Sequence, residues 1–220
     1  MKTYKNYFKD HYKYTFSIGD LKNYHDWFCA QYRTIERLIP VPLLNKSPAL
    51  EIGCGIGGLY QFLKKSGFTD YTGIEPDIQA ASFLSKQFRE AHIYRKYFET
   101  YQTTRKFKTV WAFEVLEHLD DPYKAIGKIY DLLMTDGIFI GTSPYPFKKN
   151  VYADKTHRYC LTHDNWVKLF SEVGFKQVNT YPMSFIPYLW RINKRLNIRI
   201  PFYISFPSWI STSLIIAKKK

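Results

Sequence analysis

Two carboxylates and one imidazole fall within five consecutive residues, 114–118, as Glu114, Glu117 and His118. Residues three apart share one side of a helical turn, so the two carboxylates can face the same point. Carboxylate oxygens and imidazole nitrogens are ligands for Mg²⁺ and other divalent ions. The same groups can instead take a proton from a hydroxyl, with His118 as general base and no metal. In a third interpretation, Glu117 and His118 only cap and orient the helix that follows the fourth strand.

A second group of residues forms a glycine-rich turn, LEIGCGIGG, at residues 50–58. An apolar strand is expected at 49–52 and an amphipathic helix at 59–65, on either side of the glycines. Glycine permits a tight turn and lets a ligand approach the backbone, and the start of the helix offers free N–H groups. The stretch therefore predicts a nucleotide-binding site, and the alternative is a structural turn without a ligand.

Two glycine spacings overlap in this turn, and they favour different ligands. Gly53, Gly55 and Gly58 fit G-x-G-x-x-G, the dinucleotide fingerprint. Glu75, about 20 residues further on, would then be the acid that binds the ribose. This spacing predicts a NAD-binding oxidoreductase.

The second spacing is E-x-G-x-G-x-G, which begins at Glu51 and ends at Gly57. A carboxylate at the end of the strand suits a ligand with positive charge and repels a pyrophosphate. This spacing therefore favours a nucleoside ligand that carries positive charge.

The composition is that of a globular protein with a basic surface. The 220 residues, 45% hydrophobic and 23% charged, suffice for one α/β domain with a full core. The net charge of +13 favours nucleic acid, anionic lipid or phosphorylated acceptors as partners. The three cysteines form no CxxC pair, and the first residues lack the apolar core of a signal peptide. Both features predict a cytoplasmic protein with reduced thiols.

One uncharged stretch, residues 200–217, is long enough to raise the question of a membrane span. A transmembrane helix needs about 20 mostly apolar residues. This stretch contains two prolines and several hydroxyl side chains, so we expect a loop and a strand there and no transmembrane span.

Hydrophobic patterns predict strands that alternate with helices along the chain. The expected strands are 49–52, 71–74, 92–98, 109–113, 138–142, 175–181 and 214–218, with a turn at 136–137. The expected helices are 24–39, 59–65, 78–91, 122–134 and 165–173. This alternation indicates a doubly wound, mostly parallel sheet with helices on both faces. The last two strands have no crossover helix between them, so the last strand is expected to be antiparallel. We expect one domain over 1–220, with an N-terminal helical cap at 1–45 and a lid-like insertion at 183–210.

The order of these motifs resembles that of the class I S-adenosylmethionine (SAM) dependent methyltransferases. The glycine turn, Glu75, the segments FEVLEHLDDP and DGIFIGTSPYP, and HRYCLTHDNWVKLFSEVGF all resemble one subgroup. That subgroup is the methyltransferase type 11/23 group, which contains the ubiquinone-biosynthesis O-methyltransferases. The likeness covers roughly residues 24–180. It implies a Rossmann-like, seven-stranded α/β fold, SAM as cofactor and O-methylation as the activity.

The resemblance also implies which residues bind SAM. Glu51 and the glycine loop would hold its amino-acid end, Glu75 would accept both ribose hydroxyls, and Glu99 would face the adenine. Phe113 and Glu114 would border the adenosine or the methyl-donor pocket. The full set of implied cofactor-binding residues is Glu51, Gly53, Cys54, Gly55, Gly57, Glu75, Pro76, Glu99, Phe113 and Glu114.

The E-x-x-E-H segment resembles the metal site of ubiquinone O-methyltransferases and of small-RNA 3′-end 2′-O-methyltransferases. In the RNA enzymes a further histidine follows the fifth strand, where this chain has His157. The implied catalytic residues are His118 and Glu117, and the implied ligands for Mg²⁺ or another divalent metal are Glu114, Glu117, His118 and His157. A metal there would bind adjacent hydroxyls and lower their pKa.

The acceptor is expected to be a small molecule, a glycan or a lipid-linked compound. Loop aromatics could line its pocket, namely Tyr145, Phe147, Tyr152 and Tyr159. The segment 185–209 alternates aromatic and basic residues, which suits a peripheral membrane contact, the phosphates of RNA, or a self-packed lid. RNA 2′-O-methylation is therefore the first alternative function, a NAD-binding oxidoreductase is the second, and a non-catalytic SAM-binding subunit is the third.

Overall fold

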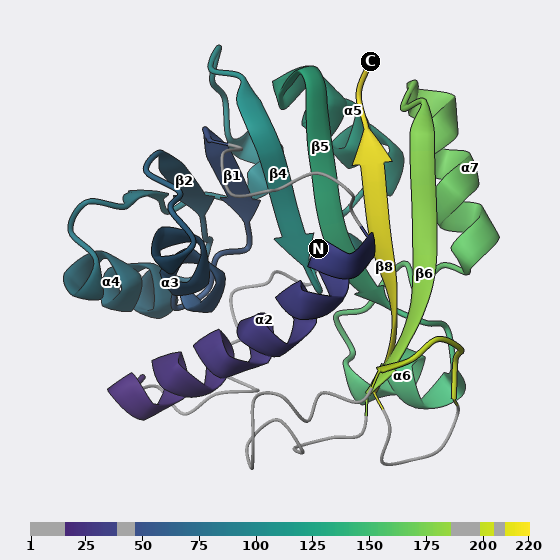
Figure 1. The fold of residues 1–220 in the computed structure, drawn as a ribbon, viewed down its shortest axis with the longest axis horizontal. Helices are drawn as coiled ribbons and strands as arrows, with labels where there is room; N and C mark the ends of the chain where they lie inside the picture. Colours follow the sequence, from purple (N-terminus) through teal and green to yellow (C-terminus); the bar gives the residue numbers. More distant parts are fainter. Residues whose placement is uncertain (1–15, 39–46, 186–198, 205–209) are drawn as a thin grey trace. The chain divides into compact units, whose positions relative to one another are not determined.

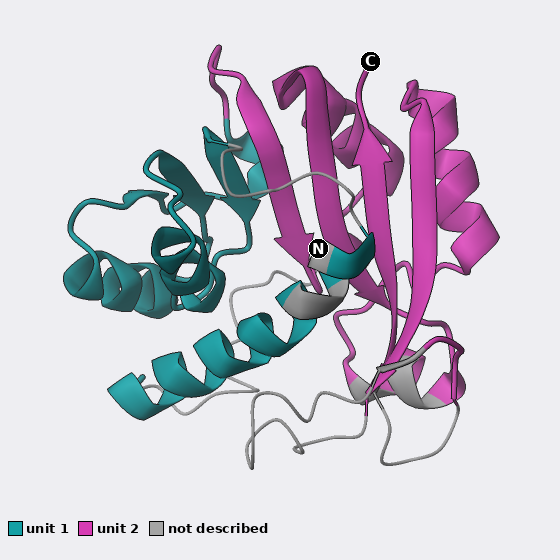
Figure 2. Cartoon of the chain, in the orientation of Figure 1, with its two compact units in different colours: residues 1–101, 188–197 teal, residues 102–187, 198–220 magenta. Residues whose placement is uncertain are grey.

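The computed structural model describes residues 16–38, 47–185, 199–204 and 210–220 (Figure 1). The chain divides into two compact units (Figure 2). The first comprises 1–101 and 188–197, and the second comprises 102–187 and 198–220. The single domain over 1–220 stays a prediction, and so does the cap at 1–45. Most of the expected lid at 183–210 lies outside the described residues.

The first unit is built on three parallel strands in the order β3-β2-β1. Its strands are β1 (Ala49–Ile52), β2 (Tyr71–Ile74) and β3 (His92–Tyr94). Its helices are α2 (Ile18–Leu38), α3 (Gly58–Lys65) and α4 (Ile78–Gln87), with a 3₁₀ turn, η3 (Phe98–Thr100). Every residue of β1 and β2 is buried, as expected of parallel strands covered on both faces.

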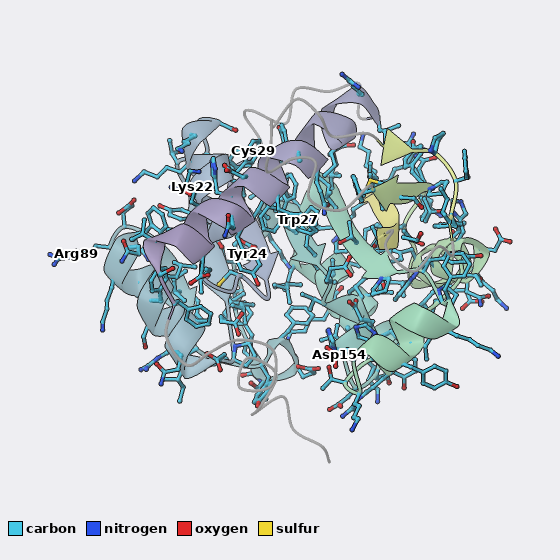
Figure 3. The ribbon with its side chains drawn as sticks, turned by 90° about the horizontal axis from the view of Figure 1, so that it is seen from below. Lys22, Tyr24, Trp27, Cys29, Arg89 and Asp154 are labelled. Atoms are coloured by element: carbon cyan, nitrogen blue, oxygen red, sulfur yellow. The ribbon has the colours of Figure 1, made fainter. Side chains whose placement is uncertain are left out.

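Helix α2 packs closely on the start of α3. A Cβ atom on Gly58 would lie 2.6 Å from the Cβ of Tyr24, which α2 presents beside Trp27 (Figure 3). Glycine at the first position of α3 therefore allows the two helices to approach. A buried cluster of Leu21, Ile56 and Ala80 joins α2, the glycine turn and α4.

The second unit contains a mixed sheet in the order β4-β5-β8-β6-β7. Its strands are β4 (Phe107–Phe113), β5 (Leu133–Pro144), β6 (Gln177–Phe185), β7 (Arg199–Ile200) and β8 (Ile210–Lys218). Its helices are α5 (Pro122–Leu132), α6 (Lys148–Ala153) and α7 (His163–Val173), with a 3₁₀ turn, η4 (Leu116–His118). Helix α7 packs along β6, beside α5 (Figure 1).

The strand β8 is antiparallel to both of its neighbours, β5 and β6, whereas β4 and β5 are parallel. This confirms the expected antiparallel last strand. Trp111 and Phe139 on the sheet, and Trp166 and Phe170 on α7, are among the largest fully buried side chains of this core. The ring of Phe139 lies 5.0 Å from that of Phe170, which holds α7 against β5.

Several predicted boundaries are wrong. The helix expected to reach residue 91 ends at Gln87, because Phe88 leaves the helical conformation and packs its ring on Tyr60, 5.0 Å away. The expected strand 92–98 ends at Tyr94, and the helix expected to reach 134 ends at Leu132. The turn at 136–137 lies inside β5, where Asp136 has a φ of 58° and the pairing with β4 shifts register. Helix α6 was not predicted.

Gly141 on β5 offers a test of how tightly this sheet packs. A Cβ atom there would lie 2.5 Å from the Ala112 carbonyl oxygen and 2.6 Å from the Phe139 ring. Gly141→Ala should therefore lower the free energy of unfolding by about 1–3 kcal/mol. The matched control is Gly127→Ala on α5, where the added atom meets nothing within 4 Å. It should raise stability by about 0.5–1 kcal/mol because alanine favours a helix. Urea unfolding measures both, and equal effects would contradict the packing described here.

Candidate active site

The turn between β1 and α3 depends on left-handed glycines. The φ angles of Gly53, Gly55 and Gly57 are 71°, 52° and 91°. Residues other than glycine are strained at positive φ angles of this kind. At Gly55 a Cβ atom would meet nothing within 4 Å, so the backbone there borders open space. The predicted glycine turn is therefore present, and it has room for a ligand beside Gly55.

Glu75 ties this turn to the end of β2. Its side chain is buried, and its two oxygens accept hydrogen bonds of 2.8 Å from the backbone N–H groups of Gly55 and Asp77. Burial raises the pKa of Glu75 to about 7, although the two backbone N–H groups oppose the shift. Each carboxylate oxygen keeps a second lone pair. Glu75 can therefore order the glycine turn and still accept hydrogen bonds from two hydroxyls of a ligand.

The raised pKa of Glu75 gives a pH-dependence that can be measured. The folded protein holds this proton up to about pH 7, whereas the unfolded chain releases it near 4.5. Glu75 therefore contributes stability that is fully present below pH 4.5 and is lost as the pH rises to 7. The loss is about 3 kcal/mol. Glu75→Gln should flatten this part of the pH profile of the unfolding free energy. Unfolding curves of both proteins at pH 4.5 and 7 measure it, and parallel profiles would contradict the assignment.

Glu51 lies on β1 and is almost completely buried. Burial raises its pKa well above the usual range, and the Tyr71 hydroxyl, which donates to Glu51 Oε2, opposes this shift. Gly73 makes room for the arrangement, because a Cβ atom there would lie 2.8 Å from Cys54 Sγ and 3.0 Å from Tyr71 Oη. Cys54 is therefore a buried neighbour of this pair, and burial raises its pKa too. The sequence analysis did not predict a role for Tyr71. Nothing in the sequence indicates that a tyrosine on β2 bonds a carboxylate on the neighbouring strand β1.

Two further predicted cofactor residues lie near Glu75 in the first unit. Pro76 follows it directly, and Glu99 lies in η3 with an exposed side chain. The charges of Glu99 and Glu75 both raise the pKa of Tyr97, after the larger effect of burial. The adenine contact of Glu99 stays a prediction.

In the second unit, β4 ends in a strained turn. Glu114 has a φ of 53°, which is uncommon for a residue other than glycine and often accompanies functional sites. Its backbone N–H donates to the Thr142 carbonyl oxygen at 3.0 Å, and its Oε1 accepts from Thr212 Oγ1 at 2.9 Å. Burial raises the pKa of Glu114. Phe113 precedes it, with its ring stacked on Trp111 at 6.2 Å. The cofactor contacts of Phe113 and Glu114 stay predictions.

Glu117 is fully buried in η4. Neither of its carboxylate oxygens has a hydrogen-bond partner among the described residues. Burial and the charge of Glu114 raise its pKa well above the usual range. The nearby Ser143 hydroxyl opposes the shift without reaching hydrogen-bond geometry. A buried carboxylate without partners is costly, so this position is suited to a proton or a cation.

Two histidines complete this group. His118 Nε2 lies 3.8 Å from Glu117 Oε1, and the His118 and His157 rings are 4.9 Å apart. The backbone N–H groups of Arg158 and Tyr159 both donate to the Glu117 carbonyl oxygen, at 2.8 and 3.1 Å. These bonds hold the loop after α6 against η4 and bring in His157. One ligand atom each from Glu117, His118 and His157 lies within 4.8 Å of the others. Three of the four predicted metal ligands therefore come together, and Glu114 is outside this group.

The loop aromatics expected to line an acceptor pocket differ from one another in their contacts and exposure. Tyr145 stacks on Tyr203 with ring centroids 3.6 Å apart, and it also contacts Phe147. Tyr159 donates from its hydroxyl to the Asp120 carbonyl oxygen. Tyr152 is 77% exposed. Their part in acceptor binding stays a prediction.

Solved structures show the same fold. A SAM-dependent methyltransferase from Archaeoglobus fulgidus matches with a TM-score of 0.66 and 20% identity, covering 89% of this chain and 94% of that one. One from Mesorhizobium loti matches with a TM-score of 0.63 and 12% identity, covering 86% and 98%. One from Thermotoga maritima, described as a possible histamine N-methyltransferase, matches with a TM-score of 0.60 and 17% identity, covering 91% and 96%. The predicted fold class, the Rossmann-like sheet of class I methyltransferases, is confirmed, and the two-residue β7 is an addition to its seven strands.

A family model for a methyltransferase domain matches residues 25–180, and the chain belongs to this family. The protein is thus a SAM-dependent methyltransferase, with SAM as its cofactor. The alternative of a NAD-binding oxidoreductase is thereby overturned. No curated protein matches the sequence. Among the described residues, no helix has the length and apolar character needed to cross a membrane.

Proposed function

We propose that the protein transfers the methyl group of SAM to a hydroxyl oxygen of a small molecule, a sugar or a lipid-linked acceptor. The observation that carries this proposal is the buried Glu117 beside His118 and His157. SAM is already an activated methyl donor, so the protein must align the acceptor and remove its proton. A neutral hydroxyl is a weak nucleophile, and a carboxylate and an imidazole in one buried group are suited to removing its proton.

The residues of the first unit are proposed to hold SAM. Glu75 would accept the ribose hydroxyls with the lone pairs that its two backbone N–H donors leave open. Glu51 would face the ammonium group, whose positive charge favours the ionised carboxylate in spite of burial. The open space beside Gly55 would admit the ligand to the backbone.

A divalent metal ion is proposed as part of the acceptor site. The residues fit one, because Glu117 has two buried oxygens without hydrogen bonds and two imidazoles lie beside it. A bound metal would supply a Lewis acid that lowers the pKa of an acceptor hydroxyl. Within the chain, Glu117, His118 and His157 would hold the ion, and His118 would take the proton if no metal binds.

Chelation separates these two forms of the proposal. Dialysis against EDTA should abolish methyl transfer, and Mg²⁺ or Mn²⁺ should restore it, if the ion is needed. Unchanged activity in EDTA would contradict the metal and leave His118 as the base. The assay measures release of S-adenosylhomocysteine with a panel of catechols, glycosides and polyprenyl-linked phenols. Methyl transfer to amines or thiols alone would overturn the proposed O-methylation.

RNA 2′-O-methylation is the second candidate function. It is favoured by the net charge of +13 and by His157, which joins the Glu117–His118 pair as the RNA enzymes would require. Binding of single-stranded RNA that weakens steeply with salt would support it. An absence of RNA binding at low salt would contradict it.

A further inference from the structure

The loop that follows α6 contains a second, independent feature beside His118. Asp154, labelled in Figure 3, ends α6 and is 93% buried, since its exposed fraction is 7%. Its Oδ1 accepts two hydrogen bonds from Thr156, one from the backbone N–H at 2.8 Å and one from the hydroxyl at 2.6 Å. The Thr156 hydroxyl oxygen also lies 3.0 Å from His118 Nδ1. The three side chains therefore form a chain of hydrogen bonds, Asp154–Thr156–His118.

The direction of each bond in this chain follows from proton counting. A threonine hydroxyl has one proton and two lone pairs. The carboxylate of Asp154 can only accept, so it receives that proton. The Thr156 oxygen is then left with lone pairs only toward His118, and Nδ1 of His118 must be the donor. A neutral His118 with its proton on Nδ1 carries a lone pair on Nε2.

The lone pair on Nε2 is the one that the proposed chemistry needs. Nε2 is the nitrogen that lies 3.8 Å from Glu117 Oε1, within the group that also contains His157. In the other tautomer Nε2 would carry a hydrogen, and His118 could neither take a proton there nor bind a metal. Partners that fix the tautomer of a histidine ligand or base in this way are common in enzyme sites.

We propose that Asp154 and Thr156 are positioning residues that hold His118 in the Nδ1–H tautomer, with the Nε2 lone pair directed toward Glu117. Their effect on methyl transfer rests on the proposed function of His118, whereas the tautomer itself does not. This chain of hydrogen bonds, called the relay below, lies wholly within the second unit and connects η4 with the loop after α6. The backbone N–H groups of Arg158 and Tyr159 donate to the Glu117 carbonyl oxygen and thereby hold the loop against η4.

Nitrogen-15 NMR of the histidine side chains tests the relay directly. The protein is labelled with ¹⁵N-histidine and measured in EDTA at alkaline pH, where the rings are neutral and free of metal. The His118 signals are assigned by their loss in His118→Gln. We expect a protonated Nδ1 and an unprotonated Nε2. A wild-type His118 with an unprotonated Nδ1 would overturn the inference.

A matched pair of variants separates positioning from a structural role. Thr156→Val has nearly the same shape but no hydroxyl, and it should shift His118 toward the Nε2–H tautomer and reduce methyl transfer about 10- to 100-fold. Thr156→Ser keeps the hydroxyl and should retain the wild-type tautomer and rate. Equal behaviour of the two variants would contradict the proposal. An unchanged signal of His163, which begins α7 in the second unit and lies 3.3 Å from the Tyr203 hydroxyl, shows that the variants are folded.

A third variant covers the case in which Thr156→Val does not fold. Asp154→Ala removes the acceptor of the Thr156 proton, so the Thr156 hydroxyl becomes free to donate to His118 Nδ1, which would place the His118 proton on Nε2. An unchanged tautomer in this variant would overturn the relay. The NMR measurement requires no acceptor, so its failure would reject the relay alone. An absence of O-methyl product would instead reject the proposed function.

Discussion

Glu117→Gln should reduce methyl transfer to a hydroxyl acceptor by roughly 100- to 10,000-fold, the range typical of lost acid–base chemistry. The amide has the shape of the carboxyl but cannot take a proton or hold a divalent ion with the same strength. The same change should not destabilise the fold. Burial of a carboxylate without hydrogen-bond partners is unfavourable, so the neutral variant should unfold at an equal or higher urea concentration. Loss of activity together with unchanged or increased stability is the expected result.

The control for this variant is Glu172→Gln on α7. Glu172 is half exposed and pairs with Lys168 at 3.9 Å, so its loss should leave both activity and stability near wild type. Calorimetry should give the same SAM affinity for wild type and both variants. If Glu117→Gln kept the wild-type rate, the carboxylate would have no part in the reaction, and Glu117 would only orient the turn.

Above pH 7, where Glu75 is ionised, Glu75→Ala should weaken SAM binding by roughly 100- to 1,000-fold, because hydrogen bonds to a charged group are worth about 1.5–3 kcal/mol each. The variant would lose the proposed bonds to the ribose hydroxyls. It would also leave the N–H groups of Gly55 and Asp77 without their partner and loosen the glycine turn. Titration calorimetry with SAM and with S-adenosylhomocysteine measures the change, and both ligands should be affected equally because they share the ribose.

The matched control removes another glutamate of the first unit by the same substitution. Glu90 accepts hydrogen bonds from Tyr60 and Lys64 on α3, and its side chain is half exposed. Glu90→Ala should leave SAM affinity unchanged. If Glu75→Ala bound SAM as tightly as Glu90→Ala, the ribose site would have to lie elsewhere.

The parts of the fold that were predicted are those that local sequence determines. The bounds of β1 and β2 match the prediction residue for residue, because β1 runs directly into the glycine turn and β2 is followed by Glu75 and Pro76. The end of α4 was not predictable in this way. The apolar pattern continues through Phe88, but in the structure the helix has ended there and the Phe88 ring packs on residues distant in sequence, including Tyr60, 28 positions earlier in the chain.

In the candidate site, too, residues marked by a local motif were predicted, and residues that depend on a partner distant in sequence were not. Glu117 and His118 are adjacent in the chain, so a local motif marks them. His157 was predicted from family resemblance, and the backbone bonds of Arg158 and Tyr159 to the Glu117 carbonyl are what bring it in. Tyr71 and Thr156 were not predicted, because their partners, Glu51 and His118, are distant in sequence. A tyrosine or threonine without its partner carries no signal of a site.

Carbon-13 NMR of the product tests the central claim of O-methylation most directly. The protein is incubated with SAM labelled at its methyl carbon and with an acceptor that releases S-adenosylhomocysteine in the panel assay. We predict that the labelled carbon appears with the chemical shift of an O-methyl group, and that Glu117→Gln yields far less of it. A labelled N-methyl, S-methyl or C-methyl product, formed at the same rate by wild type and Glu117→Gln, would contradict the account.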